Sequence, residues 1–216
     1  MIGIFGGTFD PVHYGHLRPA FEVQEELGIE QMHFVPLRDA PHRDQPEVSP
    51  ELRCALVRAA LGRRSGVCVD DRELHRDGPS YSYDTLTSFR QQLPDEPLVL
   101  LLGEDAFRGF LSWHRPLDIL ELAHLVVMQR PGEHQFDSQL QALINERQAD
   151  SPRELHDALA GRIYFQQVTQ LDISATAIRE LCAADQDISC LVPDAVATII
   201  GRLQLYTKDA GAGHSG

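Results

Sequence analysis

The sequence predicts an α/β protein built around a doubly wound, mostly parallel sheet that is flanked by helices. Short apolar runs typical of buried strands alternate along the chain with segments whose apolar residues recur at helical spacing. The first predicted strand passes straight into a helix through a glycine-rich loop at 6–10. Because ligands of such sheets bind beyond the carboxyl ends of the strands, a site is expected where Gly6, Pro36 and Gly103 follow predicted strands.

The first half of the chain opens with a strand that contains Ile2, Ile4 and Phe5. From His16 onward, apolar residues recur at helical spacing until Gly28, which is a typical helix stop. The elements expected next are a strand at 32–35, a helix capped by Ser49 with Pro50 at its first position, a strand at 67–69 and a helix at 83–92.

The second half continues the alternation. The apolar run at 98–102 predicts a fully buried strand. The elements expected after it are strands at 125–128 and 163–165 and helices at 175–183 and 193–201. The polar segment 132–153 is expected to be a variable insertion, and the Gly-rich residues 208–216 a disordered tail. Residues 1–207 are therefore predicted to form a single domain.

Length and composition agree with one enzyme-sized domain. Of the 216 residues, 43% are hydrophobic and 24% are charged, which is enough to bury a core. No apolar run is long enough to span a membrane, and Met1 leads into the first strand without a signal-peptide pattern. We therefore expect a cytoplasmic protein without membrane association. The formal net charge of −13 argues against sequence-independent nucleic-acid binding, although a few arginines aimed at one cleft can still hold a polyphosphate.

The cysteines do not suggest a metal site. Cys54, Cys68, Cys182 and Cys190 show neither CxxC spacing nor a close histidine partner. They are expected to be reduced thiols in the core or on the surface. No metal site made of protein side chains is predicted.

The loop between the first strand and the first helix has the chemistry of a phosphate site. Gly6 and Gly7 let backbone amides approach an anion closely, and the N-terminus of the following helix adds a partial positive charge. His13 and His16 bring two imidazoles to the same opening. An isolated His-x-Gly-His pattern also fits an ordinary helix-cap histidine and a solvated loop histidine. The flanking Gly-Gly-Thr-Phe-Asp-Pro favours a polyphosphate site.

Further candidate residues follow predicted strands, and each has a plainer alternative. Arg43 is able to reach a phosphate or to lie in a solvated Pro-rich loop. Asp105, two residues after Gly103, is suited to ribose hydroxyls or to capping the next helix. Trp113, the only tryptophan, is either a core residue or a stacking platform. The alternating charges at 71–77 are expected to be mostly a solvated salt-bridge network.

A second group of phosphate ligands is expected near the start of a late helix. Ser174 is first of all suited to be the N-cap of that helix. Arg179 lies one turn inside, where its guanidinium is able to join the Thr176 hydroxyl around a departing pyrophosphate.

Together these motifs resemble the bacterial nicotinate mononucleotide adenylyltransferases, within the HxGH nucleotidyltransferase superfamily. The matching blocks lie at 6–17, 36–43, 71–86, 102–132, 173–179 and 205–206. The blocks at 78–82 and 113–132 separate this family from its pantetheine-phosphate and cytidylyl relatives. The resemblance implies a Rossmann-like fold and the reaction ATP + nicotinate mononucleotide → deamido-NAD + pyrophosphate.

The resemblance also implies roles for particular residues. The triphosphate would be held by His13, His16, Ser174, Thr176 and Arg179, of which His13, His16 and Arg179 are the expected catalytic residues. ATP would also be bound by Gly6, Gly7, Thr8 and Phe9, which line the nucleotide cleft, and by Gly103 and Asp105 at its ribose. The mononucleotide would contact Arg43, Thr85 and Trp113, with Thr85 and Trp113 at the pyridine ring and its carboxylate.

Two positions depart from the family pattern. Arg43 stands where the family more often has lysine, so a forked cation replaces a point charge at the expected phosphate contact. Ala175 replaces a serine that is common in the late motif.

The implied reaction requires no nucleophilic side chain, because the mononucleotide phosphate is itself the nucleophile. Catalysis would come from alignment and from charge stabilisation by protonated histidines beside the phosphates. Mg²⁺ is expected to arrive with the ATP, and the protein to be a monomer or small homo-oligomer.

Two alternatives stay open: an enzyme that prefers nicotinamide mononucleotide, and a non-catalytic nucleotide-sensing module. A synthetase fragment is disfavoured because the chain is short and 173–179 contains no lysine.

Overall fold

A parallel sheet forms the centre of the computed structural model, which describes residues 1–39, 46–129, 132 and 134–208. Within these residues the sheet has six strands: β1 (Ile2–Gly7), β2 (Gln31–Pro36), β3 (Val67–Val69), β4 (Leu98–Gly103), β5 (His124–Gln129) and β6 (Ile163–Gln167). Their order is β3-β2-β1-β4-β5-β6, and every neighbouring pair is parallel. The predicted doubly wound α/β fold is confirmed.

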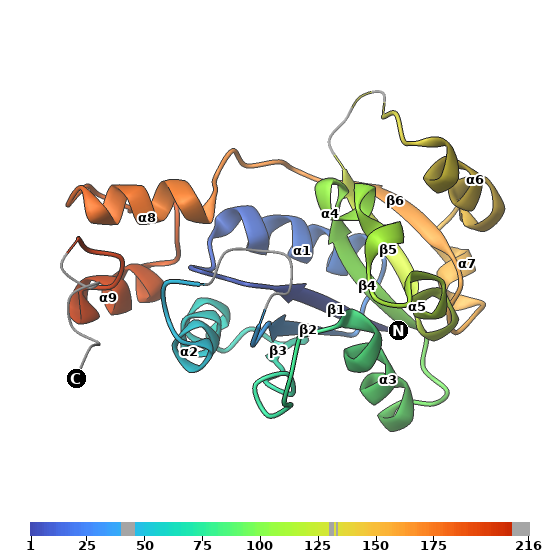
Figure 1. Ribbon diagram of the computed structural model, residues 1–216, viewed down its shortest axis with the longest axis horizontal. Helices are drawn as coiled ribbons and strands as arrows, with labels where there is room; N and C mark the ends of the chain where they lie inside the picture. The colour runs from blue at the N-terminus through green and yellow to red at the C-terminus, as the bar shows by residue number, and fades with distance from the viewer. Residues whose placement is uncertain (40–45, 130–131, 133, 209–216) are drawn as a thin grey trace.

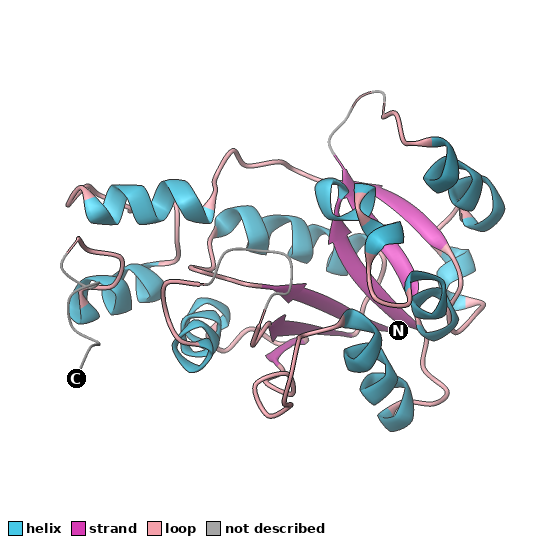
Figure 2. Ribbon diagram, in the orientation of Figure 1, coloured by secondary structure: helices cyan, strands magenta, loops and turns pink. Residues whose placement is uncertain are grey.

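Helices surround the sheet (Figures 1 and 2). Those described are α1 (Tyr14–Glu26), α2 (Pro50–Leu61), α3 (Ser82–Gln92), α4 (Glu104–Arg108), the 3₁₀ turn η1 (Phe110–Ser112), α5 (Pro116–Leu122), α6 (Ser138–Arg147), α7 (Arg153–His156), α8 (Ala175–Ala183) and α9 (Asp194–Leu203). In Figure 1, α8 and α9 lie at the end of the molecule opposite α6. Among the described residues, no helix is long and apolar enough to cross a membrane.

Alternate residues of each strand point to opposite faces of the sheet, and each face carries its own core. Phe5 and Phe34 pack on one face with apolar residues of α1, α2, α8 and α9. Ile4 and Val35, their neighbours in sequence, pack on the other face with residues of α3, α4, α5 and α6. The sequence therefore folds as a three-layer structure whose strands read as continuous apolar runs because both faces are buried.

Local signals place the ends of several helices where the sequence predicts them. The Ser49 hydroxyl accepts the backbone N–H of Leu52 at 3.3 Å and caps α2, with Pro50 at its first position. Gly28 has a φ of +62° just after α1, a conformation that glycine adopts without strain. These caps make the βα units short and direct.

The segments on either side of β5 differ from the prediction. Three short helical elements, α4, η1 and α5, separate β4 from β5. The sequence does not predict them because each is too short to show a periodic pattern. Phe107 and Phe110 are fully buried there, so tertiary packing stabilises these turns. The segment 132–153, expected to be a polar insertion, contains α6, which Asp137 caps and whose Leu140 is buried. The tail predicted at 208–216 lies outside the described residues from 209 onward.

The order of strands reverses between β1 and β4. The chain adds β2 and then β3 on one side of β1, and it adds β5 and then β6 on the far side of β4. At such a switch point the loops after the two strands diverge and leave a crevice. The carboxyl ends of β1 and β4 are Gly7 and Gly103. The topology therefore locates the site that the sequence predicts.

Candidate active site

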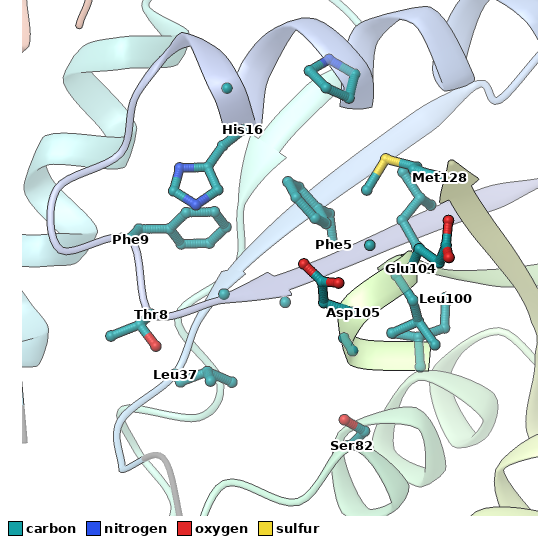
Figure 3. Close-up of a pocket in the computed structure, with 18 of the residues that line it drawn as sticks. Phe5, Thr8, Phe9, His16, Leu37, Ser82, Leu100, Glu104, Asp105 and Met128 are labelled. Atoms are coloured by element: carbon teal, nitrogen blue, oxygen red, sulfur yellow. The ribbon is translucent and has the colours of Figure 1, made fainter. Parts of the chain in front are cut away.

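A cleft of about 1660 Å³ opens at this switch point. Single small-molecule pockets are commonly about 300 to 1,000 Å³, so the cleft has room for two substrates. Figure 3 shows Phe9 and His16 on one wall, Asp105 on another, and Ser82 at the far end. The cleft lies between the loop after β1, the start of α4, and the N-terminal ends of α3 and α8.

Close packing shapes the loop after β1. A Cβ on Gly7 would lie 2.8 Å from the ring of Phe9, so only glycine fits there without a shift. Phe9 itself is buried, has a φ of +52°, and packs edge-on against His16 with ring centroids 5.2 Å apart. The predicted nucleotide-binding residues Gly6, Gly7, Thr8 and Phe9 all line the cleft.

His13 and His16 lie together at the start of α1. His13 is the N-cap, its carbonyl accepts the N–H of His16 at 2.9 Å, and the two imidazoles stack with centroids 3.7 Å apart. A Cβ on Gly15 would lie about 3.0 Å from both the His13 ring and the carbonyl of Ile173, which explains the small residue in His-x-Gly-His. The motif thus places His16 in the cleft lining, with the buried His13 ring stacked on it outside that lining.

Burial determines the charge of His13. The residue is 4% exposed, and this desolvation lowers its pKa from 6.5 to about 4. Within the described part of the chain, His13 Nδ1 and Thr8 Oγ1 are buried without a hydrogen-bond partner. The expected protonated imidazole therefore requires an added anion, because the protein alone favours the neutral form.

The start of α8 forms the opposite side of the triphosphate region. The Ser174 hydroxyl accepts the N–H of Ala177 at 3.1 Å, so the predicted N-cap is confirmed. Thr176 and Arg179 line the cleft, and Arg179 Nη2 approaches Thr176 Oγ1 at 3.5 Å. Ser174 is exposed and caps the helix from just outside the residues that line the cleft.

Arg179 also contacts groups that sequence reasoning missed. Its Nη1 donates to the backbone carbonyl of Asp10 at 2.8 Å, and its Nε donates to Glu47 Oε1 at the same distance. The Asp10 carboxylate accepts the Tyr206 hydroxyl at 2.8 Å and the N–H of Glu47 at 2.9 Å. Burial and the charge of Asp10 raise the pKa of Tyr206, which therefore stays a donor. The sequence signals were Asp10 in the loop and the closing Leu205-Tyr206.

A fully buried arginine also binds the loop after β1. Arg53 donates to the carbonyls of Thr8 at 2.6 Å, Arg38 at 3.3 Å and Val48 at 3.3 Å. Burial lowers its pKa, and the nearby Asp10 charge opposes that shift. Arg53 lies in an ordinary helical pattern, so the sequence carries no signal for this role.

The loop after β4 carries the residues predicted for the ribose. Gly103 is the N-cap of α4, and Asp105 is an exposed residue whose carboxylate points into the cleft (Figure 3). Its neighbour Glu104 pairs with Arg108 and, at 2.6 Å, with His134 Nδ1. Burial opposes the ionised form of Glu104, but these hydrogen bonds outweigh it and lower the pKa. Asp10 and Glu104 also line the cleft, but both are engaged by other protein groups, which leaves Asp105 as the exposed carboxylate there.

The expected pyridine-binding residues occupy different environments. Trp113 lines the cleft, is half-buried, and packs against Phe110 with ring centroids 5.7 Å apart. Thr85 is buried outside the cleft lining, and its hydroxyl donates to Glu73 Oε1 at 2.5 Å while it accepts from Arg76 at 3.3 Å. Burial raises the pKa of Glu73. Contact of the Thr85 hydroxyl with a substrate therefore requires it to leave Glu73.

The charged segment at 71–77 is partly solvated, as expected. Asp71 and Asp77 form exposed ion pairs with Arg58 and Arg38. Glu73 is the exception, since it is 3% exposed. Arg43 lies outside the described residues.

One cysteine has a histidine neighbour that sequence spacing does not reveal. All four are free, but Cys68 Sγ lies 3.3 Å from His33 Nδ1, because parallel pairing of β2 and β3 sets these residues side by side. Asp70 contacts the same nitrogen at 3.2 Å. Burial alone would lower the pKa of His33, but its hydrogen bonds to Asp70 and Cys68 raise it to about 9. Among the described residues, no group of three or more His, Cys, Asp or Glu could hold a metal ion.

Comparison with known proteins agrees with this geometry. The family described as cytidylyltransferase-like matches residues 4–181. A probable nicotinate-nucleotide adenylyltransferase of Methylococcus capsulatus is 45% identical over 210 residues, which cover 96% of this chain and all of the relative. One of Halorhodospira halophila is 47% identical over 196 residues, which cover 90% of each chain.

A solved structure shares the fold at lower identity. The Plasmodium falciparum nicotinic acid mononucleotide adenylyltransferase complexed with NaAD superposes with a TM-score of 0.72 at 19% identity, covering 95% of this chain and 96% of that chain. The family match extends from β1 into α8 and thus includes both sides of the cleft. The chain therefore belongs to the cytidylyltransferase-like family and, within it, to the nicotinate-nucleotide adenylyltransferases.

Proposed function

We propose that this protein transfers the adenylyl group of ATP to nicotinate mononucleotide, giving deamido-NAD and pyrophosphate in NAD biosynthesis. The observation that carries the proposal is the switch-point cleft, which brings His16, Thr176 and Arg179 together beside Asp105 and Trp113. Close relatives with the same reaction in their names cover nearly the whole chain. The cleft thus combines a triphosphate end with a ribose and pyridine end.

The chemistry is an in-line displacement at the α-phosphorus of ATP. A phosphate oxygen of the mononucleotide attacks, a P–O bond to the α-phosphorus forms, and the bond to the bridging oxygen of pyrophosphate breaks. The protein supplies no nucleophile, so alignment and charge stabilisation provide the rate. His13, His16 and Arg179 would stabilise the charge that develops on the α-phosphoryl oxygens and the leaving pyrophosphate.

Mg²⁺ is proposed as the ion that accompanies ATP. Asp10 and Asp105 are carboxylates of the cleft, but both Asp10 oxygens already accept hydrogen bonds from Tyr206 and Glu47. This donor set fits an ion held mainly by substrate phosphates and water rather than by a protein cage. Bound there, the ion would neutralise phosphate charge during the transfer.

Selectivity for the acid follows from donors in the pyridine subsite. A nicotinate carboxylate only accepts hydrogen bonds, whereas an amide NH₂ needs an acceptor. Because the Thr85 hydroxyl is engaged by Glu73 and lies outside the cleft lining, we assign the selectivity mainly to backbone N–H groups of the cleft. Leaving one polar group unpaired costs about 1 to 3 kcal/mol, so the acid should be preferred by roughly fivefold to more than a hundredfold.

The test is pyrophosphate release from ATP with either nicotinate or nicotinamide mononucleotide. Turnover with the acid and a kcat/KM at least about fivefold lower with the amide are expected. Equal kcat/KM values would widen the substrate assignment, and absence of turnover with both, despite ATP binding, would favour a nucleotide-sensing module.

Trp113→Ala tests the stacking platform in the same assay. The KM for both mononucleotides should rise together by roughly twofold to tenfold, because an aromatic contact contributes about 0.5 to 1.5 kcal/mol whatever the ring substituent. Leu117→Ala is the matched control, since Leu117 is 58% exposed and lies outside the cleft lining. A KM change for one mononucleotide alone would contradict the stacking role.

A further inference from the structure

Arg179, the proposed ligand of the ATP phosphates, lies between two carboxylates. Its Nε donates to Glu47 Oε1 at 2.8 Å, and its Nη1 lies 4.0 Å from Asp10 Oδ2. The guanidinium is 24% exposed, so one side stays open to the cleft. A phosphate that approaches Arg179 must therefore compete with anions that the protein itself supplies.

The two carboxylates differ in how firmly they are held. Glu47 is 53% exposed and is free to swing into solvent. Asp10 is 6% exposed at its side chain, and hydrogen bonds tie down both of its oxygens. Tyr206 donates to Oδ1 at 2.8 Å, and the Glu47 backbone N–H donates to Oδ2 at 2.9 Å.

Tyr206 is one of the two donors that hold the Asp10 carboxylate, 4.0 Å from Arg179. The phenol approaches Oδ1 from a closing segment that lies 196 residues away in sequence. Without the hydroxyl, a buried carboxylate would lose one of its donors, and a nearby cation would be the natural replacement. Arg53 is already occupied by three carbonyls. Arg179, whose Nη1 lies 4.0 Å from Asp10 Oδ2, is the cation within reach.

We propose that Tyr206 is a positioning residue that holds the Asp10 carboxylate away from Arg179 and so keeps this guanidinium available for the phosphates of ATP. Glu47 is the exposed anion that Arg179 releases when ATP binds. The inference rests on the proposed function, because it takes Arg179 as a phosphate ligand. On this proposal, the closing segment contacts the loop after β1 in order to position Asp10.

The test compares three variants by calorimetric titration with ATP and, separately, with nicotinate mononucleotide. Tyr206→Phe removes only the hydroxyl, and the Kd for ATP is expected to rise about tenfold while that for the mononucleotide stays within about twofold. Tyr164→Phe is the matched control, because Tyr164 is a half-buried tyrosine of β6 outside the cleft lining, and both Kd values should stay unchanged. Glu47→Gln is expected to lower the Kd for ATP about threefold, since it removes an exposed competitor.

The outcomes separate positioning from general stability. A folded Tyr206→Phe protein with an unchanged Kd for ATP, or with equal losses for both ligands, would overturn the proposal. If Tyr206→Phe does not fold, the Glu47→Gln variant provides the test. An unchanged or higher Kd of this variant for ATP would overturn the proposal. The proposed function is tested separately. It is contradicted if the wild-type protein shows no adenylyl transfer. The role of Tyr206 is contradicted if the wild-type protein is active and the variants bind ATP with the wild-type Kd.

Discussion

Replacing Arg53 by methionine tests whether a buried cation organises the phosphate loop. The guanidinium is fully buried and donates to the carbonyls of Thr8, Arg38 and Val48. Methionine preserves much of the side-chain volume but none of these donors. If each deprived carbonyl costs about 1 kcal/mol, the free energy of unfolding should fall by about 3 kcal/mol.

Thermal unfolding monitored by circular dichroism measures this loss. For a chain of this length, each kcal/mol shifts Tm by about 2 to 4 °C, so a fall of about 6 to 12 °C is expected. Arg58→Met is the matched control, because Arg58 on α2 is 54% exposed and forms a single ion pair with Asp71, which should contribute less than about 1 kcal/mol. Arg53→Lys should fall between the two, since an ammonium cannot bridge three carbonyls. A Tm shift for Arg53→Met no larger than that for Arg58→Met would refute the reasoning.

The remaining predictions concern catalysis and pH. His16→Ala should lower kcat by roughly a hundredfold or more while the protein stays folded, and near-normal turnover would remove His16 from the catalytic set. Arg179→Ala should raise the KM for ATP and slow turnover with little change in the KM for the mononucleotide, so an unchanged KM for ATP would reduce it to a surface residue. The pKa of about 4 for buried His13 means that unfolding becomes easier as pH falls from about 6.5 toward 4, because only the unfolded chain takes up the proton. The pKa of about 9 for His33 means that its stabilisation is complete below about 6.5 and is lost as pH rises toward 9. Urea unfolding across this range should therefore show an alkaline decline that His33→Gln flattens, and an equal decline in both proteins would contradict the assignment.

The sheet could be predicted from the sequence because its signals are local. Apolar runs mark the strands, and Ser49 and Gly28 mark helix ends within a few residues. The turns around Phe107 and Phe110 could not be predicted, because they depend on packing against the rest of the core rather than on a periodic pattern.

The same distinction applies to the candidate site. His16 and Arg179 belong to recognisable motifs, and the fold brings both to one cleft. Arg53 acts on a partner 45 residues away, and nothing in its own sequence surroundings marks it. Tyr206 belongs to a matching block, but its contact with Asp10 spans 196 residues and could not be read from the sequence. Glu73 was hidden among alternating charges that are otherwise solvated, and only its burial distinguishes it.

The contact between Asp10 and Tyr206 also sets an order of events during synthesis. The loop after β1 is made first, but the hydroxyl that holds its carboxylate is added 196 residues later. At ordinary rates of translation this delay is roughly 10 to 40 s, during which the nascent chain can form its first βα units without a finished phosphate site. Chains that stop before Tyr206 would keep the His-x-Gly-His motif and most of the sheet, yet lack the hydrogen bond that secures Asp10. If Tyr206 positions Asp10 as proposed, full nucleotide affinity would appear only after synthesis has reached the closing segment.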